Sequence, residues 1–576
     1  MKDITRKNIE KWLEGSYDED SKNYIRGLME SDESALEDAF YRDLEFGTGG
    51  LRGIMGIGTN RMNKYTVAMA TQGLANYIKK KVKRKTPKAA IAYDSRNNSR
   101  YFSEIAADVL SANGIQTYIF DDIRPTPELS FAIRYLQCDS GIVITASHNP
   151  KEYNGYKAYW SDGGQLVPPH DKKVISEVRK IQNIKNVQLT RNYSLVQYIG
   201  KDIDEVYLST LKSLSMNPNM IEKHNQLSIV YSPLHGTGTK IVPKALSVFG
   251  FKNVNIVKEQ ATADGNFPTV NSPNPEESEA LTMAIKQAEA SNAELVMATD
   301  PDSDRVGIAI KNNKGKFVLL NGNMTATLIF YYVCKMLKNN KLTGKEYIIK
   351  TIVTTELLAE IALKYGIKYY DVLTGFKYIA EKIRKLENEE RFICGGEESY
   401  GYLIGDHVRD KDAVISCCII AEIAAWAKEQ KKSLFDILVD IYLEFGYYRE
   451  RLFSLTKKGQ NGAKEIKQMM KNYRNNPPQS IQGVKVIKIK DYKLSEEKCL
   501  LTNTVSKINL PTSDVLQFIL EDKTTISIRP SGTEPKIKFY FSVNTTLNDS
   551  KDFDKTTLLL EQKIDGIIEK FCEVLY

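Results

Sequence analysis

Three aspartates occupy alternate positions in the segment DPDSDR, at Asp300, Asp302 and Asp304. In a looped or extended backbone this spacing turns the side chains toward one side, where the carboxylates repel one another unless a cation lies between them. A calcium-binding EF-hand loop is excluded, because its sixth position would be Arg305 instead of glycine and its twelfth Lys311 instead of glutamate. The segment predicts a site for a small, hard ion such as Mg²⁺, completed by a non-protein oxygen, with a solvated acidic turn as the alternative.

Two other segments are suited to bind an anion. In RPSGTEP, the guanidinium of Arg529 and the hydroxyls of Ser531 and Thr533 surround Gly532, whose bare backbone lets a ligand approach closely. Forked arginine donors and neighbouring N–H groups suit a phosphate, although a plain turn of this composition is also common. The glycine-rich FGTGGLRG is not a dinucleotide fingerprint, because Arg52 stands where the third glycine belongs. We interpret it as a loop that presents Arg52 to an anion.

A hydroxyl and an imidazole stand side by side in GIVITASHNP, at Ser147 and His148. No GxSxG elbow surrounds the serine and no acidic partner for the histidine is evident, so a hydrolase triad is unsupported. With an Asp-bound cation and a phosphate clamp elsewhere, Ser147 fits the role of a phosphoryl carrier. A phosphoserine carries about −1.5 to −2 charges, and its oxygen is suited to complete the cation's ligands. One more cluster, GGEESYG, offers Glu397 and Ser399 to sugar hydroxyls.

Three of these polar clusters, those at Ser147, DPDSDR and GGEESYG, each follow a run of alternating strands and helices. The hydrophobic pattern predicts strands at 89–93, 115–120 and 141–144 before Ser147, at 227–231, 254–257 and 295–298 before DPDSDR, and at 347–353, 368–372 and 391–394 before GGEESYG. Helices are expected between them, at 100–113, 127–136, 240–249, 276–290, 356–365 and 377–386. In such α/β layers, chemistry gathers at the carboxyl ends of the strands.

The expected fold is therefore three similar α/β units, with mixed sheets flanked by helices, and a smaller C-terminal α+β domain. The length of 576 residues agrees with roughly four domains of ~150 residues each. We place them at residues 1–210, 211–325, 326–449 and 450–576. A Pro- and Asn-rich stretch, NNPPQ, lies within the last of these and reads as a loop or boundary zone.

The composition is that of an ordinary globular protein, with 42% hydrophobic and 26% charged residues. The net charge of +8 is spread along the chain, which suits anionic small molecules, and the basic run at 79–85 lacks the aromatic residues of a nucleic-acid platform. The seven cysteines and five histidines show no CxxC or HExxH spacing. Because no secretory signal and no apolar run of ~20 residues is found, we expect a cytoplasmic protein without a membrane partner. The oligomeric state is left open.

The clusters, in their order along the sequence, resemble those of the α-D-phosphohexomutase superfamily. The resemblance is strongest to its phosphoglucomutase members and the neighbouring phosphopentomutase-like branch. The resemblance covers nearly the whole chain and includes NGYK after the serine motif, TGFK at 374–377 and GDHVRDKD at 405–412. It implies a four-domain, heart-shaped enzyme in which each domain lends one loop to a central cleft.

The same resemblance implies a role for each candidate residue. Ser147 would be the phosphoserine, and it would bind Mg²⁺ together with Asp300, Asp302 and Asp304. The residues expected near the transferring phosphoryl group are Arg52, His148, Lys157 and Lys411. The sugar and its second phosphate would be bound by Arg305, Thr374, Glu397, Ser399, Arg409, Arg529, Ser531, Gly532 and Thr533.

The implied reaction interconverts glucose 1-phosphate and glucose 6-phosphate, with glucose 1,6-bisphosphate as intermediate and activator. Either Lys157 or His148 would act as general base, and Lys157 would need a pKa lowered by burial or by neighbouring cations. A phosphopentomutase or a dual phosphoglucomutase/phosphomannomutase is the alternative within the class. An Mg²⁺-dependent phosphatase and a non-enzymatic sugar-phosphate binding protein are more remote alternatives.

Overall fold

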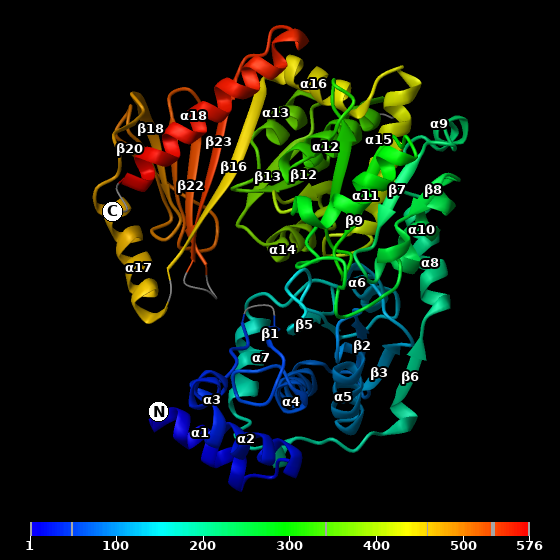
Figure 1. Ribbon diagram of the computed structural model, residues 1–576, viewed down its shortest axis with the longest axis vertical. Helices are drawn as coiled ribbons and strands as arrows, with labels where there is room; N and C mark the ends of the chain where they lie inside the picture. Colours follow the sequence, from blue (N-terminus) through cyan, green and yellow to red (C-terminus); the bar gives the residue numbers. More distant parts are fainter. Residues whose placement is uncertain (1–2, 48–49, 340–341, 458, 532–535, 574–576) are drawn as a thin grey trace. The chain divides into compact units, whose positions relative to one another are not determined.

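The computed structural model describes residues 3–47, 50–339, 342–457, 459–531 and 536–573 (Figure 1). The chain divides into two compact units. The first consists of Met1–Thr325 with Phe376–Lys431, and the second of Ala326–Gly375 with Lys432–Tyr576. We describe each unit by itself, and the four predicted domain boundaries remain a prediction.

Three N-terminal helices, α1 (Asp3–Glu14), α2 (Glu19–Ser31) and α3 (Glu33–Phe40), open the first unit. Asp18 and Asp32 cap the second and third helices by accepting backbone N–H groups of their first turns. The helices bury a cluster around Trp12, which also includes Tyr65 and Ala68 of α4 (Lys64–Lys81). They are thereby packed onto the first α/β layer.

The first sheet holds six strands in the order β1-β5-β4-β2-β3-β6. Their bounds are β1 (Gly50–Ile54), β2 (Lys88–Tyr93), β3 (Gln116–Phe120), β4 (Ser140–Ile144), β5 (Tyr153–Trp160) and β6 (Val196–Ile199). The strands β2, β3, β4 and β6 run parallel, whereas β1 and β5 are antiparallel additions. Every residue of β4 is buried, because helices cover both faces of this sheet.

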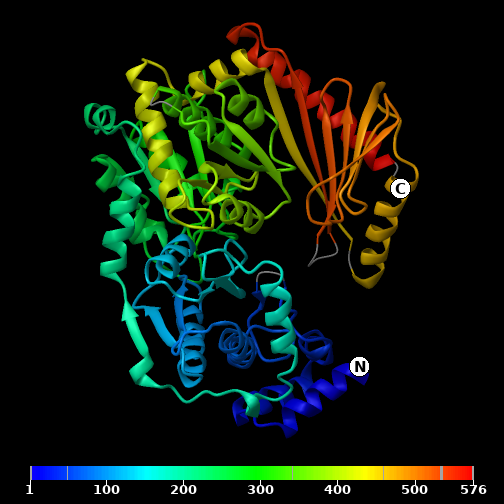
Figure 2. The same ribbon diagram turned by 180° about the vertical axis from the view of Figure 1, so that it is seen from behind.

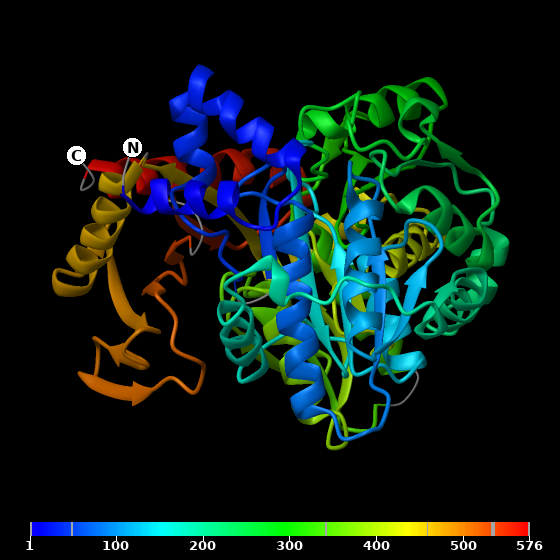
Figure 3. The ribbon, with the colours of Figure 1, turned by 90° about the horizontal axis from the view of Figure 1, so that it is seen from below.

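The helices α4, α5 (Ser99–Ala112) and α7 (His170–Arg179) pack together, and residues of all three share one hydrophobic core with the sheet. Helix α6 (Thr126–Tyr135) contacts β2 and β4 and also packs against α8 (Lys201–Lys212). Figure 3 shows α4 and α5 lying beside each other along this layer. The turn that carries Ser147 therefore leaves the carboxyl end of a strand that is held on both sides.

The second sheet of the first unit has the order β11-β10-β9-β7-β8. Its strands are β7 (Ile229–Ser232), β8 (Val254–Ile256), β9 (Leu295–Thr299), β10 (Val306–Lys311) and β11 (Phe317–Leu319). The first three run parallel, and β10 and β11 complete the sheet in antiparallel pairing. The segment DPDSDR is the connection between β9 and β10. The helices of this layer are α10 (Gly238–Phe249), α11 (Ser278–Ala290) and α15 (Ala413–Glu429).

The third α/β segment contributes strands to both units. In the second unit β12 (Glu346–Thr351) pairs in parallel with β13 (Lys368–Val372), and in the first unit β14 (Arg391–Gly396) pairs antiparallel with β15 (Tyr402–Ile404). The accompanying helices are α12 (Gly322–Asn339), α13 (Leu357–Lys364), α14 (Phe376–Leu386) and α16 (Leu434–Phe445). The cluster GGEESYG forms the turn between β14 and β15.

The second unit also contains a large antiparallel sheet with the order β16-β23-β22-β21-β18-β19-β20, to which β17 is added beside β18. Its long strands are β16 (Tyr447–Thr456), β18 (Val484–Asp491) and β23 (Lys536–Thr545), and its shorter ones are β17 (Ser480–Ile481), β19 (Glu496–Cys499), β20 (Thr504–Lys507), β21 (Leu516–Leu520) and β22 (Thr525–Pro530). Helix α18 (Phe553–Glu573) runs across β16 and β23 (Figures 1 and 2), and α17 (Gly459–Asn475) packs on β23.

The fold confirms the predicted class of three α/β units with mixed sheets and a smaller C-terminal domain, which is rich in β-structure. All nine predicted α/β strands are present with bounds shifted by at most two residues, as for β4, predicted at 141–144 and found at Ser140–Ile144. Among the described residues, no helix combines the length and the apolar character needed to cross a membrane.

Candidate functional site

Ser147 lies in the turn after β4 with its hydroxyl beside the aspartates. Its Oγ donates a hydrogen bond to Oδ2 of Asp300 at 2.7 Å, and Nδ1 of His148 lies 3.2 Å from the same oxygen. The serine is buried, and its φ of 52° falls in the left-handed region, which costs a non-glycine residue about 1–2 kcal/mol. The hydroxyl and the acidic loop therefore meet within the first compact unit, as the sequence predicted.

The three aspartates form a buried carboxylate cluster. One carboxylate oxygen from each lies within 4.8 Å of those of the others, and each residue is at most 1% exposed. Burial, together with the charges of Asp302 and Asp304, raises the pKa of Asp300 well above its usual value. Within the described part of the chain, Oδ1 of Asp302 and Oδ1 of Asp304 are buried without a hydrogen-bond partner. Unpartnered buried carboxylate oxygens of this kind fit a hard divalent cation such as Mg²⁺.

Two lysines reach the same carboxylates. Nζ of Lys157 donates to Oδ2 of Asp302 at 2.7 Å and to Oδ2 of Asp304 at 3.2 Å, and Nζ of Lys411 lies 2.8 Å from Oδ2 of Asp304. Burial acts to lower the pKa of Lys157, but the two carboxylates outweigh this effect and raise the pKa above its usual value. The lowered pKa that a lysine base would need is thus absent in this geometry, and Lys157 is a cation at neutral pH.

The surroundings of His148 shift its pKa in the opposite direction to that of Lys157. Burial lowers its pKa well below the usual value, and the positive charges of Arg305 and Arg52 lower it further. The imidazole is therefore neutral at pH 7, with a ring nitrogen near the serine hydroxyl. Of the two groups that the sequence left open as general base, His148 is the one that is already unprotonated.

Arg52 lies near the serine turn because it belongs to an antiparallel edge strand of the first sheet. It lies on β1 opposite Gly155 of β5, and Lys157 on β5 lies opposite Val143 of β4. The Arg52 side chain is exposed, and its Nη1 donates to Oδ1 of Asn149 at 3.2 Å. The β1–β5–β4 order thus places a guanidinium and an ammonium group beside the serine turn.

Three further predicted residues of the first unit lie on the turns after β14 and β15. Glu397 is buried and its N–H donates to the carbonyl oxygen of Gly401 at 2.9 Å, while Ser399 is half-buried. The guanidinium of Arg409 is buried, with Nη1 bonded to backbone carbonyls, among them that of Val408 at 3.0 Å, and Nη2 bonded to Glu387 at 2.6 Å. Arg409 is thus bound by carbonyls of its own loop and by Glu387, whereas Lys411 reaches the aspartates.

The remaining candidates lie in the second unit. Thr374 follows β13, and its Oγ1 is buried with no hydrogen-bond partner among the described residues. Arg529 belongs to β22 and Ser531 follows it, and both are half-buried. Gly532 and Thr533 lie outside the described residues.

Sequence reasoning missed three charged residues around the site. Asp94 and Arg96 follow β2 and are both buried beside the Ser147 turn, and Glu276 forms an ion pair with Arg305. For the first two a signal existed, because DSR follows a buried strand at the same sheet edge as Ser147. Glu276 offered no signal, since it begins a predicted helix and acidic residues are common in the first turn of a helix.

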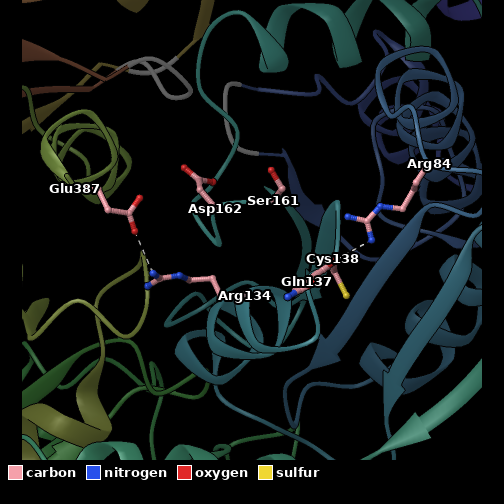
Figure 4. A pocket seen from close by; sticks show the side chains of 7 residues that line it. All are labelled: Arg84, Arg134, Gln137, Cys138, Ser161, Asp162 and Glu387. Carbon is pink, nitrogen blue, oxygen red and sulfur yellow. Dashed lines mark hydrogen bonds and ion pairs between the residues drawn. The ribbon is translucent and has the colours of Figure 1, made fainter.

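A separate pocket in the first unit does not coincide with this site (Figure 4). It is lined by Arg84, Arg134, Gln137, Cys138, Ser161, Asp162 and Glu387, none of which is a predicted site residue. Nη2 of Arg134 lies 3.3 Å from Glu387, and Nη1 of Arg84 donates to the carbonyl oxygen of Gln137 at 3.1 Å. Both guanidinium groups of this pocket thus have partners within the protein.

Comparison with known proteins agrees with the fold and the site. Three successive family profiles match the chain: "Phosphoglucomutase/phosphomannomutase, alpha/beta/alpha domain I" at residues 43–185, domain II at 205–315 and domain III at 321–445. The first match includes Ser147, the second the three aspartates, and the third GGEESYG. The α/β/α layers and the site together define a member of the α-D-phosphohexomutase superfamily.

Individual relatives point to one branch of that superfamily. The chain is 38% identical over 562 residues to a phosphoglucomutase of Staphylococcus aureus strain MSSA476, covering 97% of this chain and 98% of the relative. It is 39% identical over 511 residues to a phosphoglucomutase of Staphylococcus haemolyticus, covering 88% of this chain and 92% of the relative. The chain therefore belongs to the phosphoglucomutase/phosphomannomutase family.

Solved structures share the fold at low sequence identity. The open form of parafusin, a phosphoglucomutase from Paramecium, has a TM-score of 0.68 at 18% identity and covers 92% of this chain and 96% of its own. A phosphoglucomutase/phosphomannomutase family protein from Burkholderia thailandensis has a TM-score of 0.65 at 18% identity, with 92% and 97% covered.

Proposed function

We propose that this chain is a phosphoglucomutase that interconverts glucose 1-phosphate and glucose 6-phosphate, with Ser147 as the phosphoryl carrier. The observation that carries the proposal is the 2.7 Å contact between Oγ of Ser147 and the buried aspartate cluster. The relatives named phosphoglucomutase, at 38% and 39% identity, support the same reaction and substrate class. Sugar phosphates are thus the proposed small-molecule partners.

The reaction proceeds in two half-reactions that share one intermediate. In the first, the bond between phosphorus and Oγ of phosphorylated Ser147 breaks, and the 6-hydroxyl of glucose 1-phosphate forms a new bond to phosphorus. The product is glucose 1,6-bisphosphate, which also serves as activator by phosphorylating Ser147. In the second, the intermediate turns over, the phosphoryl group on its 1-oxygen passes to Oγ of Ser147, and glucose 6-phosphate is released.

The charged residues around Ser147 have two roles: some would hold Mg²⁺, and others contribute positive charge directly. Asp300, Asp302 and Asp304, with an oxygen of the serine side chain, would hold Mg²⁺, and their unpartnered buried oxygens fit that ion. Bound Mg²⁺ supplies positive charge to the phosphoryl oxygens, which is the main need of phosphoryl transfer. Arg52 and Lys157 contribute further positive charge to the same oxygens.

His148 is the proposed general base. It accepts the proton of the attacking sugar hydroxyl in the first half-reaction and returns it to the departing oxygen in the second. Its neutral state at pH 7 and its place beside Oγ of Ser147 support this role. Lys157 remains protonated and stabilises charge. A variant His148→Gln that kept the pH profile of the wild-type kcat would contradict this assignment.

The other predicted residues are assigned to the sugar and its second phosphate. Arg305, Thr374, Glu397 and Ser399 bind sugar hydroxyls, with Arg409 supporting the loop that carries Lys411. Arg529, Ser531, Gly532 and Thr533 bind the phosphate that is not transferred. Arg529→Ala is expected to raise KM more than it lowers kcat, because it removes binding common to the ground state and the transition state.

Two measurements test the proposal. Ser147→Ala is expected to lose the interconversion of glucose 1-phosphate and glucose 6-phosphate, and wild-type turnover in this variant would overturn the mechanism. The wild-type protein should release no inorganic phosphate from sugar phosphates, whereas an Mg²⁺-dependent phosphatase would. Turnover on glucose, mannose and ribose phosphates then distinguishes a glucose enzyme from a dual phosphomannomutase or a phosphopentomutase.

A further inference from the structure

One buried arginine binds four backbone carbonyl oxygens in and directly after the loop that carries Ser147. Arg96 is 3% exposed. Its Nη2 donates to the carbonyl oxygen of Ser147 at 2.6 Å and also to that of Asn149, and its Nη1 donates to the carbonyls of Pro150 at 2.9 Å and Tyr153 at 3.1 Å. A planar guanidinium is suited to such a task, because its donors point in fixed directions.

The carbonyl oxygen between those bound by Arg96 also has a partner. His148, which lies between the residues bound by Arg96, accepts a hydrogen bond at its own carbonyl oxygen from Oγ of Ser272 at 3.2 Å. Four successive carbonyls, from Ser147 to Pro150, are thus bonded to side chains outside the loop. These side chains therefore help to fix the conformation of the loop.

A second set of contacts fixes the other side of the serine. Nε of Arg96 lies 3.3 Å from Oδ2 of Asp94, and the same carboxylate oxygen accepts a hydrogen bond from Oγ1 of Thr145 at 2.6 Å. Oγ1 of Thr145 in turn accepts the N–H of Ser147 at 2.8 Å. The carbonyl and the N–H of Ser147 are therefore joined through one buried chain of three side chains, Arg96, Asp94 and Thr145, which we call the serine clamp.

The serine clamp accounts for the unusual backbone of Ser147. Its φ of 52° is unfavourable for a residue with a side chain, and such a conformation persists only where the surroundings hold it. This φ sets the direction in which Oγ leaves the backbone, and Oγ meets Asp300 at 2.7 Å. Through Asn149, whose side chain accepts from Arg52, the clamp also reaches the guanidinium assigned to the phosphoryl group.

We propose that Arg96, acting with Asp94 and Thr145, is the positioning residue that aims the phosphoryl-carrying oxygen of Ser147. This inference rests on the proposed role of Ser147 as carrier. Because a displacement of about 1 Å in a reacting group can reduce a rate about 100-fold, loosening the clamp affects transfer more than it affects substrate binding.

Arg96→Lys is the test, because one ammonium group cannot reproduce donors in four directions. Thr145→Val removes only the hydroxyl that links Asp94 to the N–H of Ser147. Arg124→Lys is the matched control, since Arg124 is also buried in the first unit and its Nε donates to Oδ1 of Asp204 at 2.7 Å. For each protein, intact-mass analysis follows phosphoryl uptake from glucose 1,6-bisphosphate, and calorimetry measures the Kd for glucose 1-phosphate.

We expect Arg96→Lys to take up the phosphoryl group about 100-fold more slowly, and Thr145→Val about 10-fold more slowly, with Kd values within about threefold of wild type. Arg124→Lys should stay within about threefold in both measurements. Uptake at the wild-type rate in Arg96→Lys overturns the inference, as does a parallel loss of binding and uptake. If Arg96→Lys does not fold by circular dichroism, Thr145→Val decides by the same criteria. Failure of the wild-type protein to acquire the group contradicts the proposed function instead.

Discussion

Replacing Lys157 by methionine removes one of the two ammonium groups that balance the aspartate cluster. Its Nζ lies 2.7 Å from Asp302 and 3.2 Å from Asp304, and all three side chains are buried or nearly so. Removing one partner of a buried ion pair costs about 3–5 kcal/mol, because the other charge is left uncompensated. Without added metal, the variant is expected to unfold at a markedly lower temperature than the wild type.

Mg²⁺ should reverse much of this loss. The ion brings positive charge to the same carboxylates, so it stabilises Lys157→Met more than it stabilises the wild-type protein. Thermal unfolding of both proteins in EDTA and in excess Mg²⁺ measures the difference. Turnover of the variant should still fall about 10²- to 10³-fold, which is the usual effect of removing one group that stabilises transition-state charge.

Lys350→Met is the matched control for the stability measurement. Lys350 is also a fully buried lysine between two carboxylates, with Nζ 2.8 Å from Glu356 and 2.9 Å from Asp371, but it belongs to the second compact unit. Its loss should destabilise the protein, and Mg²⁺ should stabilise this variant no more than it stabilises the wild type. Equal Mg²⁺ stabilisation of wild type and Lys157→Met, or turnover of that variant within about threefold of wild type, would refute the reasoning.

Three further predictions follow from the same geometry. The pKa of His148 is lowered in the folded protein, so the contribution of this residue to stability is fully present above its unfolded pKa of about 6.5. This contribution is lost as the pH falls below that value. In thermal unfolding, His148→Gln should therefore lose less stability between pH 7 and pH 5 than the wild type does. Asp302→Asn removes one charge and one unpartnered oxygen from the cluster, so the Mg²⁺ concentration for half-maximal stabilisation should rise at least about tenfold, and an unchanged value speaks against the metal site. Burial raises the pKa of Cys138 to about 12, so iodoacetamide at pH 8 should leave this thiol unmodified in the folded protein and modify it in guanidinium chloride, as read by peptide mass mapping.

The motifs around Ser147, Asp300 and Glu397 were predictable because each follows a largely apolar, buried strand in a contiguous segment. A buried strand that ends in small polar residues marks the carboxyl edge of a sheet, and the structure brings the first two of these edges into hydrogen-bond contact. Most of the parallel strands were predictable for the same reason, but β6, which has only four residues and is partly exposed, was not. The antiparallel strands β1 and β5 were not, since their mixed composition leaves no clear period. The antiparallel strand β10 was also not predicted, although it is apolar and buried.

The remaining features depend on contacts between segments far apart in the sequence. The raised pKa of Lys157 comes from two carboxylates about 145 residues away, and the burial of Arg96 comes from carbonyl groups of a loop about 50 residues away. A single sequence without these distances does not predict the sign of the pKa shift of Lys157. The hydrogen-bond partners of Arg409 could not be predicted from the sequence for the same reason.

The most direct test of the central claim is a chase experiment on Ser147. Protein phosphorylated with labelled glucose 1,6-bisphosphate is freed of ligand, digested and mapped, before and after addition of unlabelled glucose 1-phosphate. We expect label on the peptide containing Ser147 and its transfer to the sugar within one turnover. Label on another residue, or label that stays on the protein while sugar phosphates interconvert, would contradict the claim.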